Sequence, residues 1–570
     1  ARARNLPGER GTCLLVEKIL GAGEHLRGDW PVDGTTGYEF AVLAVGTLVD
    51  SRAAPILAAA YAKFIGTQLD PHEVSYRSMR LVMQTSLASE VNVLGHLLNR
   101  VSESNRWYRD FTLNSLTAAV REVIACFPVY RTYLVPGNPP DEHDARVIGR
   151  ALAEARRRNP ALERSVFSFL RDVLMPPEDN QHPVDEELRR MFVLKFQQCT
   201  GPITAKGVED TAFYVYNRLI ALNEVGGEPA IVGRSLEEFH RANQARAAEF
   251  PRSLLATSTH DTKRSEDVRA RIAAISELPK EWARAVRRWQ TVNRKHLRLL
   301  EEGTAPDPNE EYLIYQTLVG AWPLAPMNQQ QREQFVRRIQ DYMVKALHEA
   351  KVNSSWLEPN EAWDNAVQEF IAAILKPGAR NRFLGSFEPF ATRIAELGAI
   401  NSLSQLVWKT TVPGVPDLYQ GTEIWDFSLV DPDNRRPLDY SQRRQALASI
   451  PHTSAADLWT NWRDGRIKLF ITQKLLRFRR DHPDLFNAGT YTPIEVAGTH
   501  RESLIAYERA HEGHRVLAAT TRLSSRVGSP PCSDRWVDTS LSLPPHEENW
   551  FDLFTGREFR CVGTLPAARI

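Results

Sequence analysis

Cysteine is scarce in this sequence, and the cysteines that are present lie far apart. Five occur among 570 residues, none of them in a Cys-x-x-Cys pair. A zinc site uses cysteine pairs at fixed spacing, and a disulfide framework groups many cysteines in a short chain. The sequence therefore favours reduced thiols in a cytoplasmic protein, at Cys13, Cys126, Cys199, Cys532 and Cys561.

Long apolar runs are also missing. The longest, such as 13–16 and 372–375, are far shorter than the roughly 20 residues that a helix needs to cross a bilayer. Residues 1–10 are polar and basic, and no apolar segment of a secretory signal follows them. We expect neither a membrane segment nor a signal peptide.

Neither sign of charge dominates. The chain has 71 Lys and Arg against 70 Asp and Glu, a net charge of +1. Attraction to nucleic acid or to an anionic membrane requires a surplus of positive charge. The balance argues against both partners and favours a small or uncharged ligand.

Short apolar segments alternate with long stretches of helical periodicity. The pattern predicts strands at 13–16, 201–204, 253–257 and 415–419, and a turn at 34–37. Apolar residues recur every three or four positions in several stretches, for example Met83, Leu87, Val91, Leu94, Leu98 and Val101; Val166, Leu170 and Val173; Trp282, Val286 and Trp289; and Trp363, Val367, Phe370 and Ile374.

This alternation is typical of an α/β fold with a parallel sheet covered on both faces. We expect a (β/α)₈ barrel with large helical insertions and a C-terminal all-β domain. The expected divisions are a barrel segment with strand five (1–50), a helical insertion (51–200), a barrel segment with strands six and seven (201–276), a second insertion (277–380), a barrel segment with strand eight and the final helix (381–486), and the β domain (487–570).

Glu17 follows the first apolar segment directly. A retaining glycosyl transfer needs two carboxyl groups about 5–5.5 Å apart, one as nucleophile and one as acid and base. Burial at a strand end favours the protonated form of a carboxyl group, which suits the acid. The alternative is a surface ion pair with the adjacent Lys18.

His260 and Asp261 follow another apolar segment, 253–257. An imidazole and a carboxylate at the end of a rigid strand are both suited to bind sugar hydroxyls. Asp261 is equally suited to cap a helix that starts at about 262. A metal site of a phosphohydrolase is a further alternative, but His240 and His296 do not complete a set of ligands with these two residues.

Five blocks of the sequence resemble, in order, those of the maltooligosyltrehalose synthase family, which belongs to the α-amylase superfamily of glycoside hydrolases. They are Leu15-Val16-Glu17-Lys18-Ile19-Leu20 with Trp30-Pro31-Val32-Asp33-Gly34-Thr35-Thr36-Gly37-Tyr38-Glu39-Phe40; Ala205-Lys206-Gly207-Val208-Glu209-Asp210-Thr211-Ala212-Phe213-Tyr214; Ala256-Thr257-Ser258-Thr259-His260-Asp261-Thr262-Lys263-Arg264-Ser265-Glu266-Asp267; Val415-Pro416-Asp417-Leu418-Tyr419-Gln420-Gly421-Thr422-Glu423; and Leu429-Val430-Asp431-Pro432-Asp433-Asn434-Arg435-Arg436-Pro437.

The resemblance implies an isomerase that converts the reducing-end α-1,4 linkage of a maltooligosaccharide to the α,α-1,1 linkage of maltooligosyl trehalose, in trehalose biosynthesis. It implies no metal and no organic cofactor, and a pathway link to a maltooligosyltrehalose trehalohydrolase. By resemblance Glu17 is the general acid and base, Asp261 stabilises the transition state, and His260, Lys206, Glu209 and Trp30 bind substrate. For Lys206 a helix-capping or surface role is nearly as good an interpretation, and for Trp30 a place in the core.

The nucleophile of the superfamily precedes the acid, on strand four, in a Gly-x-Arg-x-Asp block. Only sixteen residues precede Glu17, so we expect the amino-terminal part of such an enzyme, with its nucleophile, to be missing from this chain. Asp29 in Arg27-Gly28-Asp29 only mimics the block. Two other classes remain open: a glucan hydrolase or glucanotransferase of the same superfamily, and a non-catalytic glucan-binding protein.

Overall fold

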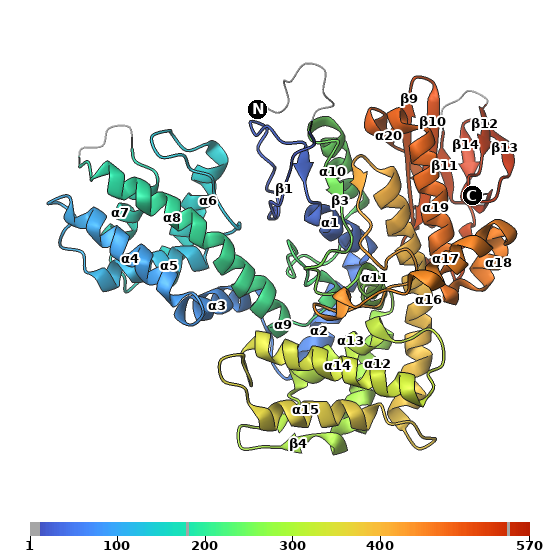
Figure 1. The fold of residues 1–570 in the computed structure, drawn as a ribbon, viewed down its shortest axis with the longest axis horizontal. Coiled ribbons are helices and arrows are strands. Elements are labelled where there is room, and N and C mark those ends of the chain that lie inside the picture. Colours follow the sequence, from blue (N-terminus) through green and yellow to red (C-terminus); the bar gives the residue numbers. More distant parts are fainter. Residues whose placement is uncertain (1–11, 178–181, 544–547, 570) are drawn as a thin grey trace.

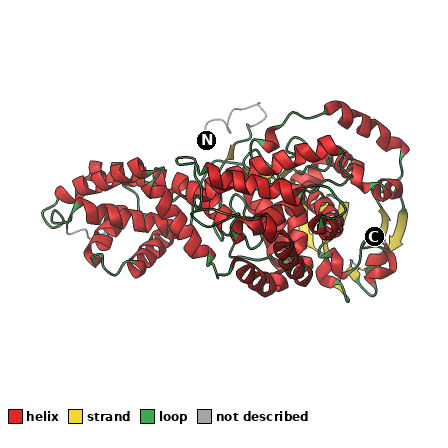
Figure 2. Ribbon diagram, turned by 90° about the horizontal axis from the view of Figure 1, so that it is seen from below, coloured by secondary structure: helices red, strands yellow, loops and turns green. Residues whose placement is uncertain are grey.

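The computed structural model describes residues 12–177, 182–543 and 548–569. Most of these residues are helical, and a small β region forms the carboxyl-terminal end (Figures 1 and 2).

Four two-residue strands lie at the centre of the fold, with their bounds at β1 (Leu15–Val16), β2 (Gly34–Thr35), β3 (Leu254–Leu255) and β6 (Val415–Pro416). β1 pairs with β2 and β3 pairs with β6, both in parallel. Between the pairs, the Thr35 amide donates to Ser253 Oγ at 3.3 Å. The parallel pairing agrees with the expected α/β organisation. The expected full burial of the strands is found only for β2, since β1, β3 and β6 contain half-buried or exposed residues.

The turn predicted at Gly34–Gly37 is wrong, because Gly34 and Thr35 form β2. The glycine is needed there for a different reason. A Cβ on Gly34 would lie 2.5 Å from Ser253 Cα, so only glycine lets the neighbouring chain approach this closely.

Helices pack around these strands and connect them. They are α1 (Tyr38–Leu48), α2 (Ala54–Ile65), α10 (Leu236–Glu249), α11 (Glu266–Ala274), α16 (Arg382–Thr411), α17 (Tyr440–Ser449), α18 (Ala455–Thr460), α19 (Arg466–Asp481) and α20 (Pro483–Asn487).

A helical arm projects to one side (Figures 1 and 2) and has an apolar core of its own. It contains α3 (Pro71–Gln84), α4 (Ala88–Glu103), α5 (Leu113–Ala125), α6 (Glu142–Arg158), α7 (Arg164–Leu174) and α8 (Glu186–Thr204). The chain returns from the arm through a π-helix, η3 (Ala205–Ala212), and the short helix α9 (Phe213–Val215).

The helical periodicity of the arm is confirmed in part. Val166, Leu170 and Val173 are buried on α7, as predicted. The stretch from Met83 to Val101, however, is divided between α3 and α4.

The strand predicted at 201–204 is wrong, since these residues end α8. Gly201 and Pro202 suggested a break in the chain. The helix continues through them because Phe192, Phe196 and Ile203, at helical spacing, are fully buried in the core of the arm.

A second helical group, expected from the apolar periodicity beyond residue 277, packs below the strands in Figure 1. Trp282, Val286 and Trp289 are buried in this group, and so are Trp363, Val367 and Phe370. Its elements are α12 (Pro279–Asn293), the hairpin of β4 (Arg298–Leu299) and β5 (Thr304–Ala305), α13 (Pro308–Ala321), α14 (Gln329–Ala350) and α15 (Glu361–Ile374).

The carboxyl-terminal region is antiparallel β structure with short 3₁₀ turns, as the sequence predicts. β10 pairs with β9, and β9 with β7. The strands are β7 (Thr490–Pro493), β8 (Val496–Ala497), β9 (Leu504–His511), β10 (His514–Thr521), β11 (Ser540–Ser542), β12 (Glu548–Phe551), β13 (Glu558–Cys561) and β14 (Thr564–Pro566).

Among the described residues, no single helix is long and apolar enough to cross a membrane. α1 and the segment Ser51–Ile65 reach that length and apolarity only as a pair, bent by 69°. Both contribute buried side chains to the main core.

Fully buried ion pairs join α11 to α16 and α19. Glu266 lies 3.0 Å from Lys409 Nζ and 2.8 Å from Lys468 Nζ. Lys468 also lies 2.9 Å from Asp267. Burial acts to raise the pKa of Glu266, but the two ammonium groups hold this pKa below its ordinary value.

The ion cluster yields a stability prediction. Lys468→Met leaves Asp267 buried without its cation, and losing one partner of a buried pair costs about 3–5 kcal/mol. We expect a fall of that size in the free energy of unfolding, measured with denaturant. Lys280→Met, at an exposed position on α12, is the matched control and is expected to change it little. Equal effects of the two substitutions would contradict a stabilising role for the cluster.

Candidate active site

Glu17 directly follows β1, at the carboxyl end of the strand. Its side chain is exposed, so the expected burial is not found. The alternative of an ion pair with Lys18 is not found either, because Lys18 is buried and lies 2.6 Å from Glu24. The hydroxyl of Tyr38 donates to Glu17 Oε1 at 3.5 Å, the outer limit of a hydrogen bond.

His260 and Asp261 lie on the loop that follows β3. Both are exposed, and His260 Nε2 lies 3.2 Å from Asp261 Oδ2. The side chain of Asn434 fixes the backbone of this loop, since its Nδ2 donates to the carbonyl of His260 at 3.0 Å. Asp261 does not cap a helix, because Ser265 is the N-cap of α11.

Tyr38 links the two strand ends. It is the first residue of α1, directly after β2 and the turn at Gly37. The hydroxyl of Thr259 bonds to Tyr38 Oη at 3.4 Å and accepts from the Asp261 amide at 3.1 Å. A chain of hydrogen bonds therefore runs from Glu17 through Tyr38 to the backbone of Asp261.

The electrostatics of Tyr38 locate three acidic candidates around it. Burial raises the pKa of Tyr38 to about 12, and the negative charges of Asp261, Glu17 and Glu209 act in the same direction. Three acidic residues selected from separate parts of the sequence, Glu17, Asp261 and Glu209, therefore act electrostatically on one hydroxyl group.

Glu209 is the most buried of the three. It lies on η3, where the hydroxyl of Tyr130 donates to its Oε1. Burial raises the pKa of Glu209 to about 7, while Tyr130 and the charge of Lys263 oppose the increase. A carboxyl group of this kind exchanges its proton near neutral pH.

Lys206 belongs to a charged chain beside Glu209. Its exposed ammonium group lies 2.6 Å from Asp210 Oδ2, and Lys263 Nζ lies 2.6 Å from Asp210 Oδ1. Lys263 comes two residues after Asp261, so Asp210 connects η3 to the loop of His260 and Asp261.

Trp30 lies at the edge of this group. It is half-buried and packs edge to face against Tyr133, with ring centroids 4.6 Å apart. None of the contacts found among the described residues joins it to Glu17 or Asp261. Asp29 is exposed and pairs with Arg27 at 3.1 Å.

Among the described residues, no group of three His, Cys, Asp or Glu side chains is placed to hold a metal ion.

The comparisons with known proteins agree on one family. No family model matches the chain. A curated protein of Mycobacterium tuberculosis, named "Putative maltooligosyl trehalose synthase", is 33% identical over the whole chain. The solved maltooligosyltrehalose synthase of Arthrobacter ramosus is 31% identical over 98% of the chain, with a TM-score of 0.79. A hypothetical maltooligosyl trehalose synthase of Sulfolobus tokodaii is 28% identical over 97% of the chain, with a TM-score of 0.73.

The chain is a homologue of maltooligosyltrehalose synthases. It spans 65% of the length of the curated relative and of the Arthrobacter enzyme, and 64% of the Sulfolobus one. The resemblance found in the five sequence blocks is confirmed.

Sequence reasoning missed two residues that organise the candidate site. Tyr38 directly follows a strand and a glycine turn, a position that could have drawn attention to it. Glu224 is fully buried and accepts the amides of Val225 and Lys263 at 3.0 and 2.8 Å. No signal in the sequence around Glu224 indicates its contact with Lys263, which lies 39 residues further along the chain.

The raised pKa of Glu209 predicts a pH dependence of stability. Between its ordinary value of 4.5 and about 7, native Glu209 holds a proton that the unfolded chain releases. The free energy of unfolding therefore falls as pH rises through this window, by about 3 kcal/mol for a shift of this size.

Glu209→Gln removes this titration and retains an acceptor for Tyr130. Denaturant unfolding at pH 5 to 8 is expected to show the wild type losing stability relative to the variant. Glu237→Gln, at an exposed position on α10, should follow the wild type. Parallel curves for wild type and Glu209→Gln would contradict the raised pKa.

Proposed function

We propose that the whole protein is an isomerase that converts the reducing-end α-1,4 linkage of maltooligosaccharides to the α,α-1,1 linkage of maltooligosyl trehalose. The supporting observation is that hydrogen bonds through Tyr38 and Thr259 join Glu17, at the end of β1, to the backbone of Asp261, on the loop after β3, in a homologue of maltooligosyltrehalose synthases. The product then passes to a hydrolase that releases trehalose, a maltooligosyltrehalose trehalohydrolase.

In this proposal β1, β2, β3 and β6 are strands five to eight of a (β/α)₈ barrel. Support comes from their parallel pairing and from the contact between β2 and β3. Strand six is then β2, in place of the strand expected at 201–204. In such barrels catalytic side chains lie at the carboxyl ends of strands, the position of Glu17 and of the loop with Asp261.

Glu17 is assigned the proton transfers. It protonates the glycosidic oxygen while a second carboxylate, not assigned to any residue of this chain, attacks the sugar carbon and forms a glycosyl ester. The released glucose turns in place. Its anomeric hydroxyl then attacks the ester, Glu17 takes the proton from this hydroxyl, and the second carboxylate leaves.

Asp261 is assigned to the transition state, in which positive charge develops on the sugar ring. His260, 3.2 Å from Asp261, is assigned to bond to the hydroxyls of the same sugar. Tyr38 positions Glu17 through their hydrogen bond.

The terminal glucose is assigned to the side of the site formed by η3. Lys206 and Glu209 offer it a donor and a carboxyl group, and Trp30 offers an aromatic face. The helical insertions at 51–200 and 277–380 are proposed as walls that limit the access of water to the ester.

A competing function is hydrolysis by the same site, because both Glu17 and Asp261 are exposed to water. The number of reducing ends separates the two reactions. Turnover of maltopentaose by the intact natural protein lowers that number if the glucose is transferred, and raises it if water attacks.

Glu17→Gln tests the acid. The substitution keeps the shape and removes the proton donor, so we expect a 10²–10⁴-fold lower kcat for the loss of reducing ends, with unchanged folding. Asp29→Asn is the control and is expected to retain normal turnover, since Asp29 pairs only with Arg27 among the residues described. Near-normal turnover of Glu17→Gln would remove it from the mechanism, and a loss in Asp29→Asn would identify Asp29 as the nucleophile.

Asp261→Asn tests the stabiliser. A group whose hydrogen bonds tighten as the ring flattens acts mainly in the transition state. We expect kcat and kcat/KM to fall together while KM changes little. A raised KM with unchanged kcat would show that Asp261 only holds substrate.

A further inference from the structure

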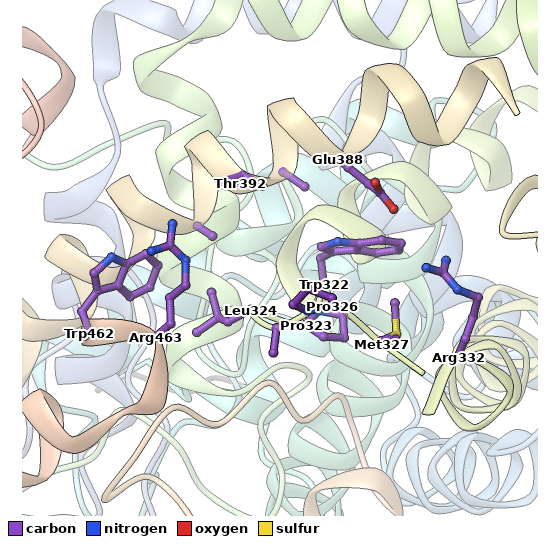
Figure 3. Close-up of a pocket in the computed structure, with 13 residues that line it drawn as sticks. Trp322, Pro323, Leu324, Pro326, Met327, Arg332, Glu388, Thr392, Trp462 and Arg463 are labelled. Carbon is purple, nitrogen blue, oxygen red and sulfur yellow. The ribbon is translucent and has the colours of Figure 1, made fainter. Parts of the chain in front are cut away.

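A cavity of about 280 Å³ lies apart from the residues discussed above (Figure 3). It is formed by the segment after α13, the first turn of α14, one face of α16 and the turn before α19. None of its lining residues belongs to the candidate active site. Its volume is just below the range for small-molecule sites, roughly 300–1,000 Å³.

Trp322 is the central aromatic group of this cavity. It is half-buried, and its ring packs edge to face against Phe335 and Phe387, at 5.3 and 4.9 Å. The backbone of Trp322 is fixed by α11, because the buried Arg271 of that helix donates from Nη1 to the Trp322 carbonyl at 2.6 Å. The ring is therefore held in place before any ligand arrives.

Two charged groups face the cavity near Trp322 without pairing with each other. Arg332 Nη1 is shielded from solvent, and it has no hydrogen-bond partner within the described part of the chain. No ion pair or hydrogen bond to the Glu388 carboxylate was found among those same residues. In Figure 3 the Glu388 carboxylate is drawn above the Trp322 ring and the Arg332 guanidinium beyond the right-hand end of the ring.

The opposite end of the cavity carries a second aromatic and cationic pair (Figure 3). The guanidinium of Arg463 lies 4.7 Å from the centre of the Trp462 ring. The carbonyl of Trp462 accepts a hydrogen bond from Trp425 Nε1 at 2.6 Å, which anchors this end. Between the two ends, Ala391 and Ala395 of α16 leave the space unfilled.

These features fit a chain of sugar rings. A pyranose ring has an apolar face for stacking on an indole and hydroxyls that both donate and accept. Glu388 accepts from such hydroxyls, and Arg332 and Arg463 donate to them. A simple anion would use the guanidinium groups but would be repelled by Glu388.

We infer that this cavity is a second binding site for α-1,4-glucan, separate from the site of reaction. The class of sugar rests on the proposed function; the presence of a carbohydrate site rests on the cavity. In this role Trp322 carries one glucose ring, Arg332 and Glu388 bond to its hydroxyls, and Arg463 contacts a neighbouring unit.

Calorimetric titration of the 570-residue chain with maltoheptaose tests the inference. Trp322→Ala and Glu388→Gln are each expected to raise Kd, the former about tenfold or more, equivalent to about 1.4 kcal/mol. Glu388→Gln keeps the shape of the side chain, so a raised Kd in this variant is not explained by loss of folding. Trp107→Ala removes an exposed tryptophan of the arm and is expected to leave Kd unchanged.

A variant of the exposed His260 distinguishes binding at this cavity from binding at the site of reaction. His260→Ala is expected to leave the affinity of the cavity unchanged. No binding of maltoheptaose, or binding that only His260→Ala weakens, overturns the second site without touching the proposed function. Binding of inorganic phosphate in competition with maltoheptaose also overturns it, in favour of an anion site. The proposed function fails separately, if reducing ends are not lost in the maltopentaose assay.

Discussion

Buried charged side chains fix the ends of the loop that carries His260 and Asp261. Glu266 accepts from Thr257, the second residue after β3, and pairs with Lys409 and Lys468 of two other helices. Charges this deep are stable only while every partner remains, so the cluster tolerates one arrangement of α11, α16 and α19. The specificity of that arrangement matters more here than its contribution to stability.

Glu224 holds the same loop from the other side. It accepts the amides of Lys263 and Arg264 and lies 3.0 Å from Arg269. Both ends of the loop are therefore fixed by buried carboxylates, while His260 and Asp261 between them stay exposed. A loop built in this way presents exposed side chains from a rigid frame, which suits the proposed binding of a sugar chain.

The features that the sequence predicted correctly are local ones. The strand before His260 and Asp261 could be located because its residues form a short apolar run, and the helices of the arm because their apolar residues repeat every three or four positions. The errors concern contacts between distant segments. Gly34 is a glycine because of Ser253, Pro202 stays in a helix because of the core of the arm, and Tyr38 and Glu224 gain their roles only when loops from separate regions meet.

The exposure of Glu17 places a condition on the proposed reaction. The acid has to hold its proton until the glycosidic oxygen arrives, and in this structure water reaches its carboxyl group. The sugar itself can change this environment, because a ring bound over Glu17 and Tyr38 displaces that water and lowers the local dielectric. A glucan that covers Glu17 well favours transfer to the retained glucose, and one that covers it poorly favours attack by water.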